Sequence, residues 1–184
     1  IPLLDTISPE AKDIGAVNTV RIEDGKSHGF NTDWIGVDGA LREIPNLEDK
    51  KVIINGTGGA TRAAIYALNK LNVVPYVYGR NEEKLELLTK EFKIITTDSL
   101  STEKIDIFIN GTPIGLEKEE RYPIEDTVLR GFEYVFDMVY GETELLRRAQ
   151  SFSVKTINGF EMVLHQGYEQ FEILTGEKVP KEVM

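Results

Sequence analysis

The sequence predicts an α/β protein built around a doubly wound parallel sheet. From residue 51 onward, short runs rich in Val and Ile alternate with longer amphipathic segments, which is typical of parallel strands joined by helices. A glycine-rich turn follows the first of these runs and opens a helix, as in Rossmann-like folds. Residues 1–44 lack this alternation, so we expect them to be the remnant of a second α/β domain.

The composition is that of an ordinary globular protein and excludes several classes of function. Of the 184 residues, 41% are hydrophobic and 28% are charged, and the net charge is −10. This charge argues against binding to nucleic acid or to an anionic membrane surface, because both favour clustered positive charge. The chain has no Cys and no apolar run long enough to span a membrane. Because it opens at Ile1 and not at Met, we expect further residues upstream.

The first 44 residues predict two short helices and a hairpin. Ser8 is a suitable N-cap for a helix that Pro9 begins and Gly15 ends. Asp24 and Gly25 form a typical two-residue hairpin turn. The other expected elements are strands at Val17–Ile22 and Lys26–Phe30 and a helix from Asp33 to Ile44. These elements make a poor core alone, so this part is either the remnant of a larger layer or a lobe resting on the rest.

A polar break at residues 45–50 separates this part from the alternating pattern, so we place a domain boundary there, with domains at 1–44 and 45–184. Each predicted strand is short and apolar on both faces, as expected for strands covered by helices on both sides. The strands are expected at Lys51–Asn55, Val74–Tyr78, Lys93–Thr96, Ile105–Ile109, Tyr134–Phe136 and Val154–Ile157. The helices are expected at Ala60–Leu71, Glu82–Phe92 and Thr143–Phe152, before a terminal helix whose amphipathic stripe contains Phe160, Val163, Leu164, Tyr168, Phe171 and Leu174.

The glycine-rich turn after the first strand predicts a site for a dinucleotide. Gly56 permits the tight turn, and Gly58 lets the backbone approach a pyrophosphate. The N–H groups and the dipole of the following helix then bind this anion. By strict count the third position of the fingerprint is Thr61 rather than Gly or Ala, and a turn without a ligand is the alternative interpretation. The residues of the predicted turn are Gly56, Thr57, Gly58, Gly59 and Ala60.

The end of the second strand favours NADP over NAD. An NAD site usually has a carboxylate at this point to bind the ribose 2′-hydroxyl, whereas this chain has Gly79, Arg80 and Asn81 there, with Lys84 one turn later. A guanidinium binds a 2′-phosphate through paired, charge-assisted hydrogen bonds and stacks on adenine. The alternative is that Arg80 and Lys84 only balance two neighbouring glutamates at the start of a helix.

Three polar side chains are candidates for a substrate site. Asn18 interrupts an otherwise apolar strand and must find partners there. Asp33 is an N-cap in the simplest interpretation and a substrate contact in the alternative. Gln166 lies on a helix that begins at the carboxyl edge of the sheet, where ligands bind. The two histidines, His28 and His165, have no partner at metal-ligand spacing, so we interpret both as structural or surface residues and expect no metal site.

Together these motifs resemble the shikimate dehydrogenase family over the whole chain. Six blocks occur in the family's order, which is far more specific than any one block. The blocks are Ile14–Thr19, Gly29–Gly36, Gly56–Ala60, Asn110–Leu116, Asp137–Tyr140 together with Thr143–Leu146, and Asn158–Gly167. The resemblance implies an N-terminal substrate domain and a C-terminal NADP domain with a cleft between them. Residues 1–44 would then be the C-terminal remnant of the substrate domain, and the last helix would pack back toward it.

The resemblance also implies a reaction and the residues that serve it. The reaction is the reversible reduction of 3-dehydroshikimate to shikimate by NADPH, a step of aromatic amino acid biosynthesis. Asp33 would bind a substrate hydroxyl and pair with a catalytic Lys. The other implied substrate contacts are Asn18, Tyr140 and Gln166. The implied cofactor contacts are Gly56, Thr57, Gly58, Gly59 and Ala60 at the pyrophosphate, Gly79, Arg80, Asn81 and Lys84 at the adenosine, and Met138, Gly159 and Met162 near the nicotinamide.

The chain departs from the family pattern in three places. The family's catalytic Lys lies in a block upstream of the part that resembles Ile1 and is absent from this sequence, and Lys12 lies on a surface helix and does not replace it. Gly79 stands where the family has Asn, and the segment from Tyr140 to Thr143 is short. We therefore expect the chain alone to bind NADP but to turn over poorly, since acid–base assistance is worth about 10²–10⁴ in rate.

Two other functions stay open. One is a non-catalytic NADP-binding module, and the other is a related dehydrogenase that prefers quinate to shikimate. For the main interpretation the expected partner is a small molecule, shikimate or 3-dehydroshikimate, with no nucleic acid and no membrane, and a homodimer is left open. The expected location is the cytoplasm.

Overall fold

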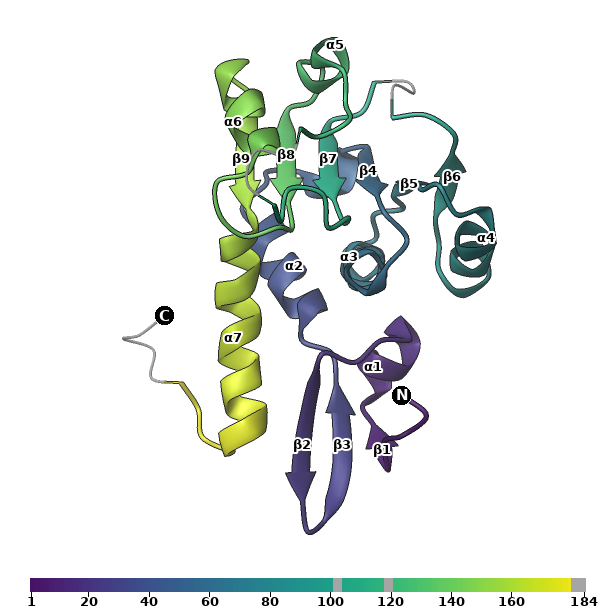
Figure 1. Cartoon of the computed structure of the whole chain (residues 1–184), viewed down its shortest axis with the longest axis vertical. Coiled ribbons are helices and arrows are strands. Elements are labelled where there is room, and N and C mark those ends of the chain that lie inside the picture. Colours follow the sequence, from purple (N-terminus) through teal and green to yellow (C-terminus); the bar gives the residue numbers. More distant parts are fainter. Residues whose placement is uncertain (101–103, 118–120, 180–184) are drawn as a thin grey trace.

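The computed structural model describes residues 1–100, 104–117 and 121–179, and its largest element is a six-stranded parallel sheet (Figure 1). The strands follow the order β6-β5-β4-β7-β8-β9, so the chain starts at the centre, builds one half of the sheet, and returns to build the other. This order confirms the predicted doubly wound, Rossmann-like fold. The strands are β4 (Val52–Asn55), β5 (Tyr76–Tyr78), β6 (Ile95–Thr97), β7 (Ile107–Asn110), β8 (Tyr134–Asp137) and β9 (Lys155–Asn158).

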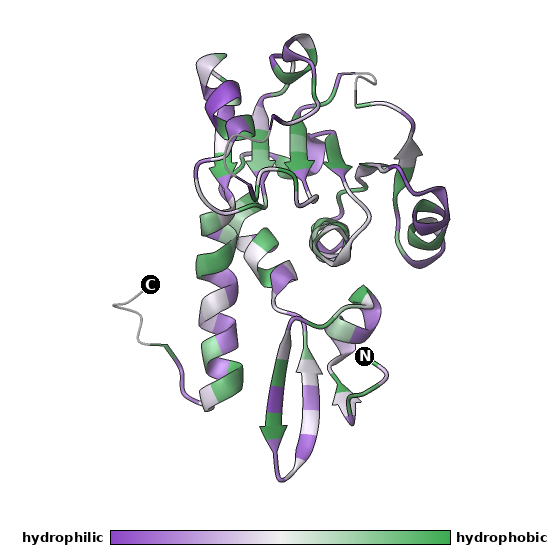
Figure 2. Ribbon diagram, viewed as in Figure 1, coloured by the Kyte–Doolittle hydropathy of each residue, from purple (hydrophilic) through white to green (hydrophobic). Residues whose placement is uncertain are grey.

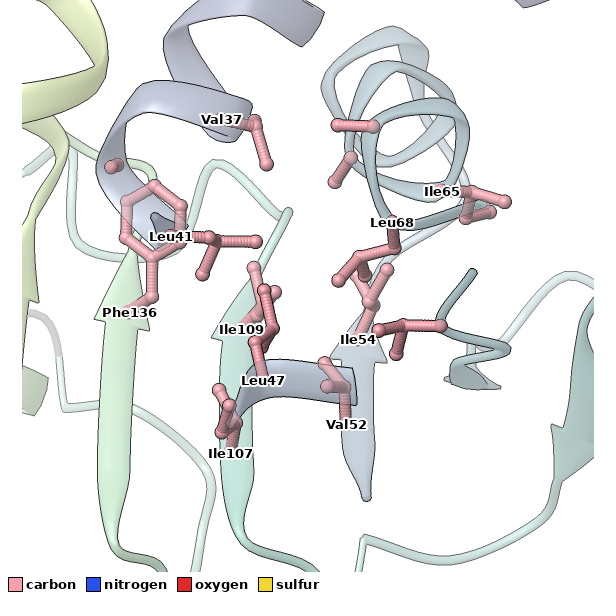
Figure 3. Close-up of a cluster of buried hydrophobic side chains, with 14 of the residues drawn as sticks. Val37, Leu41, Leu47, Val52, Ile54, Ile65, Leu68, Ile107, Ile109 and Phe136 are labelled. Atoms are coloured by element: carbon pink, nitrogen blue, oxygen red, sulfur yellow. The ribbon is translucent and has the colours of Figure 1, made fainter. Parts of the chain in front are cut away.

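The three central strands are buried on both faces, as their unbroken apolar sequences predict. Alternate residues of β4 point to opposite faces: Val52 and Ile54 enter one hydrophobic cluster, and Ile53 enters another. The first cluster is drawn in Figure 3. The helices that follow the strands are α3 (Gly59–Lys70), α4 (Glu82–Glu91), α5 (Asp126–Leu129), α6 (Glu144–Ser151) and α7 (Gly159–Thr175), and a short 3₁₀ helix spans Leu47–Asp49.

The N-terminal residues form a small three-stranded sheet with the order β1-β3-β2. The predicted hairpin turn is present, with positive φ of 50° at Asp24 and 74° at Gly25. The predicted cap is also present, because the Ser8 side chain accepts a hydrogen bond from the Ala11 N–H at 3.1 Å. The elements are β1 (Thr6–Ile7), α1 (Pro9–Ile14), β2 (Thr19–Glu23), β3 (Lys26–Phe30) and α2 (Asp33–Leu41).

Helices α2 and α7 pack side by side between the two sheets. Val37 and Leu41 of α2 are fully buried in the cluster beneath the large sheet (Figure 3). Helix α7 runs alongside α2 toward the small sheet (Figure 1), where Ile173 O accepts a hydrogen bond from Arg21 Nη1 at 3.2 Å. Residues on either side of the polar break at 45–50 therefore share one core, and the division into domains at 1–44 and 45–184 stays a prediction.

The amphipathic stripe of the terminal helix does not face the core. Phe160, Phe171 and Leu174 are 54%, 44% and 54% exposed, and Figure 2 shows apolar stretches at both ends of α7. The inner side of α7 instead buries Gly159 and Met162. Among the described residues, no helix has the length and apolar character that a membrane crossing requires.

Candidate active site

A cleft of about 520 Å³ opens at the carboxyl ends of β4 and β7, where the strand order reverses. Ligands of doubly wound proteins bind at this point of the sheet. The cleft brings together the glycine turn, the loop after β5 and the loop after β7, as the sequence predicts for the first two. Its lining includes Asn55, Gly56, Thr57, Gly58, Tyr78, Gly79, Arg80, Asn81, Gly111, Thr112 and Ile114.

The glycine turn is held against the loop after β7 by Thr61. Gly56 has a φ of 135°, and a Cβ at this position would lie 2.6 Å from Thr61 Oγ1 and 2.8 Å from Gly111 O. Thr61 is fully buried, and its hydroxyl donates to Gly111 O at 3.3 Å. Thr61, which stands where the fingerprint has Gly or Ala, therefore has a structural role, since its hydrogen bond holds the turn against the neighbouring loop.

The start of α3 has the features that bind a pyrophosphate. Gly58 occupies the N-cap position and has no side chain with which to cap the first N–H groups, which include those of Gly59 and Ala60. No atom of the described residues lies within 4 Å of a Cβ built on Gly58, so the approach to these donors is open. A helix of 12 residues directs its partial positive charge to the same place. The residues present therefore fit a dinucleotide.

The loop after β5 places a cation beside this anion site. The Arg80 side chain is exposed at the cleft, and Lys84 is exposed but lies outside the lining. Asn81 caps α4, because its Oδ1 accepts a hydrogen bond from the Lys84 N–H at 2.9 Å. A Cβ on Gly79 would lie 2.5 Å from Thr57 Cγ2. Glycine at position 79 thus makes room for the branched side chain in the glycine turn.

A row of polar residues at the sheet edge underlies the cleft, and it was not expected as a unit from the sequence. Asn55, Asn110, Asp137 and Asn158 end four neighbouring strands and are paired in register. Asn110 Nδ2 donates to Asp137 Oδ1 at 2.8 Å, and its Oδ1 accepts from the Thr112 N–H at 2.9 Å. The row therefore fixes the backbone of the loops that surround the cleft.

Tyr122 completes this row from a distant loop. Its side chain is 1% exposed, and its hydroxyl accepts a hydrogen bond from Asn55 Nδ2 and donates to Asn110 Oδ1 at 3.1 Å. Burial raises the pKa of Tyr122 above its ordinary value, so the phenol stays neutral. Burial also raises the pKa of Asp137, against the hydrogen bonds that it accepts from Thr143 and Asn110.

The residues expected near the nicotinamide lie where β8 and β9 meet α7. A Cβ on Gly159 would lie 2.6 Å from Met138 O, so the start of α7 can approach the end of β8 only with glycine there. Met162 is 5% exposed and packs in the core, and Met138 is half-buried against the same cluster. Both methionines therefore lie at this edge of the sheet, with little of Met162 accessible to a ligand.

The three polar candidates of the substrate site are brought together. Asn18 Nδ2 lies 2.7 Å from Asp33 Oδ1, 3.0 Å from Thr32 Oγ1 and 3.5 Å from Gln166 Oε1. The N-cap interpretation of Asp33 is wrong, because Thr32 occupies the N-cap position and Asp33 is the first helical residue. Burial raises the pKa of Asp33, while the hydrogen bond from Asn18 lowers it in part.

This polar group lies next to the glycine helix. A Cβ on Gly59 would lie 3.7 Å from Ala16 Cβ, two residues before Asn18. Arg62 of α3 donates from Nε to Ile14 O in the same segment. The candidate substrate group and the candidate cofactor cleft therefore meet at the start of α3.

The structure places four other residues apart from this group. Tyr140 is 67% exposed and lines a separate hollow with Leu116 and Glu142. His28 shares a hydrogen bond of 2.7 Å with Thr6, and His165 is exposed on α7. Lys12 is exposed on α1.

The sheet order, the uncapped helix start and the adjacent guanidinium define a dinucleotide-binding protein of the Rossmann type. A family model described as the "Shikimate 5'-dehydrogenase C-terminal domain" matches residues 159–184. The chain is 38% identical to the "Shikimate dehydrogenase (NADP(+))" of Aquifex aeolicus over all of this chain and 69% of that protein. It is 41% identical to the enzyme of the same name from Methanocaldococcus jannaschii, over 98% of this chain and 70% of that one. The chain belongs to the shikimate dehydrogenase family.

Solved structures agree with this assignment. The crystal structure of shikimate dehydrogenase from Aquifex aeolicus matches with a TM-score of 0.90, covering 100% of this chain and 70% of that one at 38% identity. The Thermus thermophilus enzyme, solved in complex with NADP(H) and shikimate, matches with a TM-score of 0.84 at 33% identity, covering 96% of this chain and 69% of that one.

Proposed function

We propose that this chain is an NADP-dependent oxidoreductase that interconverts shikimate and 3-dehydroshikimate. The observation that carries the proposal is the meeting of two preformed groups at the start of α3. One is the anion-binding turn with Arg80 beside it, and the other is the cluster of Asn18, Asp33 and Gln166. Its relatives are named for the same reaction and cofactor.

The chain's own residues bind and orient the cofactor. Backbone N–H groups at Gly58, Gly59 and Ala60 hold the pyrophosphate, and Arg80 holds the 2′-phosphate, with Lys84 adding positive charge nearby. When bound, NADPH supplies the hydride that reduces the substrate carbonyl. The nicotinamide end of the cofactor lies near Met138, Gly159 and Met162.

Asn18, Asp33 and Gln166 hold the substrate hydroxyls. The Asp33 carboxylate accepts a hydrogen bond from the hydroxyl that becomes the carbonyl, and Asn18 keeps that carboxylate oriented at 2.7 Å. Gln166 reaches the same group from the cofactor side, and its Oε1 lies 3.5 Å from Asn18 Nδ2. Tyr140 is proposed as a further substrate contact. It has to turn inward from its exposed position to reach the ligand.

Calorimetric titration of the chain with NADP⁺, NAD⁺, shikimate and quinate tests the binding part of this proposal. We expect NADP⁺ to bind tighter than NAD⁺ and shikimate to bind tighter than quinate. A steady-state assay of NADP⁺ reduction with shikimate then tests turnover. Absence of binding by both NADP⁺ and shikimate to folded protein would refute the proposal, and binding of NADP⁺ alone would favour a non-catalytic module.

Three finer statements belong to the same proposal. The chain divides functionally into a substrate part at 1–44 and a cofactor part at 45–184, which limited proteolysis within residues 45–50 tests. A homodimer is left open, and sedimentation equilibrium decides it. It acts in the cytoplasm, which cell fractionation tests.

A further inference from the structure

The substrate group depends on how closely two helices approach. Asp33 lies at the start of α2, and Gln166 lies in the middle of α7. Asn18 reaches both, with its Nδ2 at 2.7 Å from Asp33 Oδ1 and 3.5 Å from Gln166 Oε1. The second distance is already at the limit of a hydrogen bond, so any widening between α2 and α7 removes it.

Two glycines of α2 set that approach. A Cβ on Gly36 would lie 2.5 Å from Met162 O and 2.7 Å from Met162 Cγ. A Cβ on Gly39 would lie 2.5 Å from Cδ2 of the His165 ring. The two contacts differ in kind, because the first is with backbone and the second is with an exposed side chain.

The contact between Gly36 and Met162 lies about one helical turn from the substrate group on each helix. Gly36 follows Asp33 by three residues, and Met162 precedes Gln166 by four. Helix α2 cannot move away, since Val37 and Leu41 are fully buried in the core on its other side. The side of α7 that bears its apolar stripe is exposed, so α7 is the helix that an added side chain would displace, together with Gln166.

We propose that Gly36 and Gly39 are positioning residues for the substrate site. They hold α7 against α2 at the spacing that lets Asn18 and Gln166 act on one ligand, and neither touches the ligand itself. This inference rests on the proposed function for the identity of the ligand. The helix spacing itself can be measured without a ligand.

The test uses Gly36→Ala and Gly39→Ala in the full chain, with Gly167→Ala as the matched control. Gly167 lies on α7 next to Gln166, and a Cβ there would have no described atom within 4 Å outside its chain neighbours and its own helix backbone. We expect both α2 variants to bind shikimate about tenfold or more weakly, as for loss of one hydrogen bond to the ligand, and Gly39→Ala to leave NADP⁺ affinity unchanged. We expect the control to retain both affinities.

A rescue separates positioning from general damage. Removing the ring in the double variant Gly39→Ala/His165→Ala should restore shikimate affinity to within about twofold of the His165→Ala single variant. Gly36→Ala/Met162→Ala should not be restored, because the clash with the backbone carbonyl of Met162 remains. If Gly36→Ala does not fold, the Gly39 pair still decides the matter.

A ligand-free readout keeps this inference distinct from the proposed function. The side-chain amide NMR signals of Asn18 and Gln166 should shift in Gly39→Ala and return in the double variant. Unchanged amide signals in folded Gly39→Ala, or equal losses of shikimate and NADP⁺ affinity, would overturn the positioning role. If wild-type protein binds no shikimate, the proposed function is refuted. The amide signals then still test whether Gly39 sets the spacing between α2 and α7.

Discussion

Replacing Tyr122 by Phe should destabilise the protein because it leaves one buried hydrogen-bond donor, Asn55 Nδ2, without its acceptor. The hydroxyl accepts from Asn55 Nδ2 and donates to Asn110 Oδ1 at 3.1 Å in a fully buried environment. Asn110 Oδ1 still accepts hydrogen bonds from the Thr112 N–H at 2.9 Å and from the Thr112 hydroxyl at 2.6 Å, so losing the Tyr122 hydroxyl costs little stability at this atom. Asn55 Nδ2 loses the hydroxyl that it binds and stays buried.

The expected cost follows from that count. One buried unsatisfied group costs about 1–3 kcal/mol in the free energy of unfolding. For a chain of this size each kcal/mol lowers Tm by about 2–4 °C, so a loss of about 2 kcal/mol lowers Tm by about 4–8 °C. The ring itself keeps its edge-on packing against Phe108, at 5.7 Å between centroids, so no cavity term adds to this cost.

Urea unfolding and thermal melting measure the change, with Tyr140→Phe as the control. Tyr140 is 67% exposed, and its variant should stay within about 0.5 kcal/mol of the wild type. Because burial raises the pKa of Tyr122, wild-type stability should also fall as pH rises above about 10, whereas Tyr122→Phe lacks this contribution. A loss below about 0.5 kcal/mol would refute the reasoning, since it would show that the hydroxyl is not needed to satisfy Asn55.

Three further changes have expected outcomes. Arg80→Ala should weaken NADPH binding roughly 10- to 100-fold and NADH binding far less, measured by fluorescence titration, and equal losses would contradict the 2′-phosphate contact. Because burial raises the pKa of Asp33, ionisation of this carboxyl above about pH 4 destabilises the folded protein. Asp33→Asn should therefore be more stable than wild type at pH 7 and lose that advantage as the pH falls to 4, measured by urea unfolding. A stability difference that does not change with pH would contradict this expectation. Leu41→Ala should lower the free energy of unfolding by about 2–5 kcal/mol, because Leu41 is fully buried beneath the large sheet, and a loss under 1 kcal/mol would show that α2 is not part of that core.

Local sequence signals were sufficient for the large sheet. The strands expected at Lys51–Asn55 and Tyr134–Phe136 agree with β4 and β8 to within one residue at each end, since they are short apolar runs bounded by polar residues. Strand β1 was missed because it has only two residues and forms by long-range pairing of Thr6 with His28. The strand expected from Val17 begins at Thr19 in the structure, so Asn18 precedes it and is free to turn toward Asp33.

The apolar stripe of the terminal helix lies largely on its exposed side for a physical reason. Hydropathy patterns locate the face that carries large apolar side chains. The face of α7 that packs on α2 meets Gly36 through the Met162 backbone and Gly39 through the His165 ring, so it needs few large apolar side chains. The pattern therefore indicated the exposed face, with Phe171 and Leu174.

The cofactor cleft could be predicted more fully than the polar row beneath it. Gly56, Gly58 and Arg80 lie at fixed offsets from two strands, so their meeting follows from the parallel order. Tyr122 joins Asn55 across 67 residues, and no local pattern encodes that contact. A signal did exist for most of the rest of the row, because the apolar strands β4, β7 and β8 each end in Asn or Asp.

A crystal structure of this chain with NADP⁺ would show where the dinucleotide binds. We expect the pyrophosphate at the start of α3, about 3 Å from the N–H groups of Gly58 to Ala60, and the 2′-phosphate paired with the Arg80 guanidinium. A cofactor bound elsewhere, or bound here with its 2′-phosphate directed away from Arg80, would contradict it.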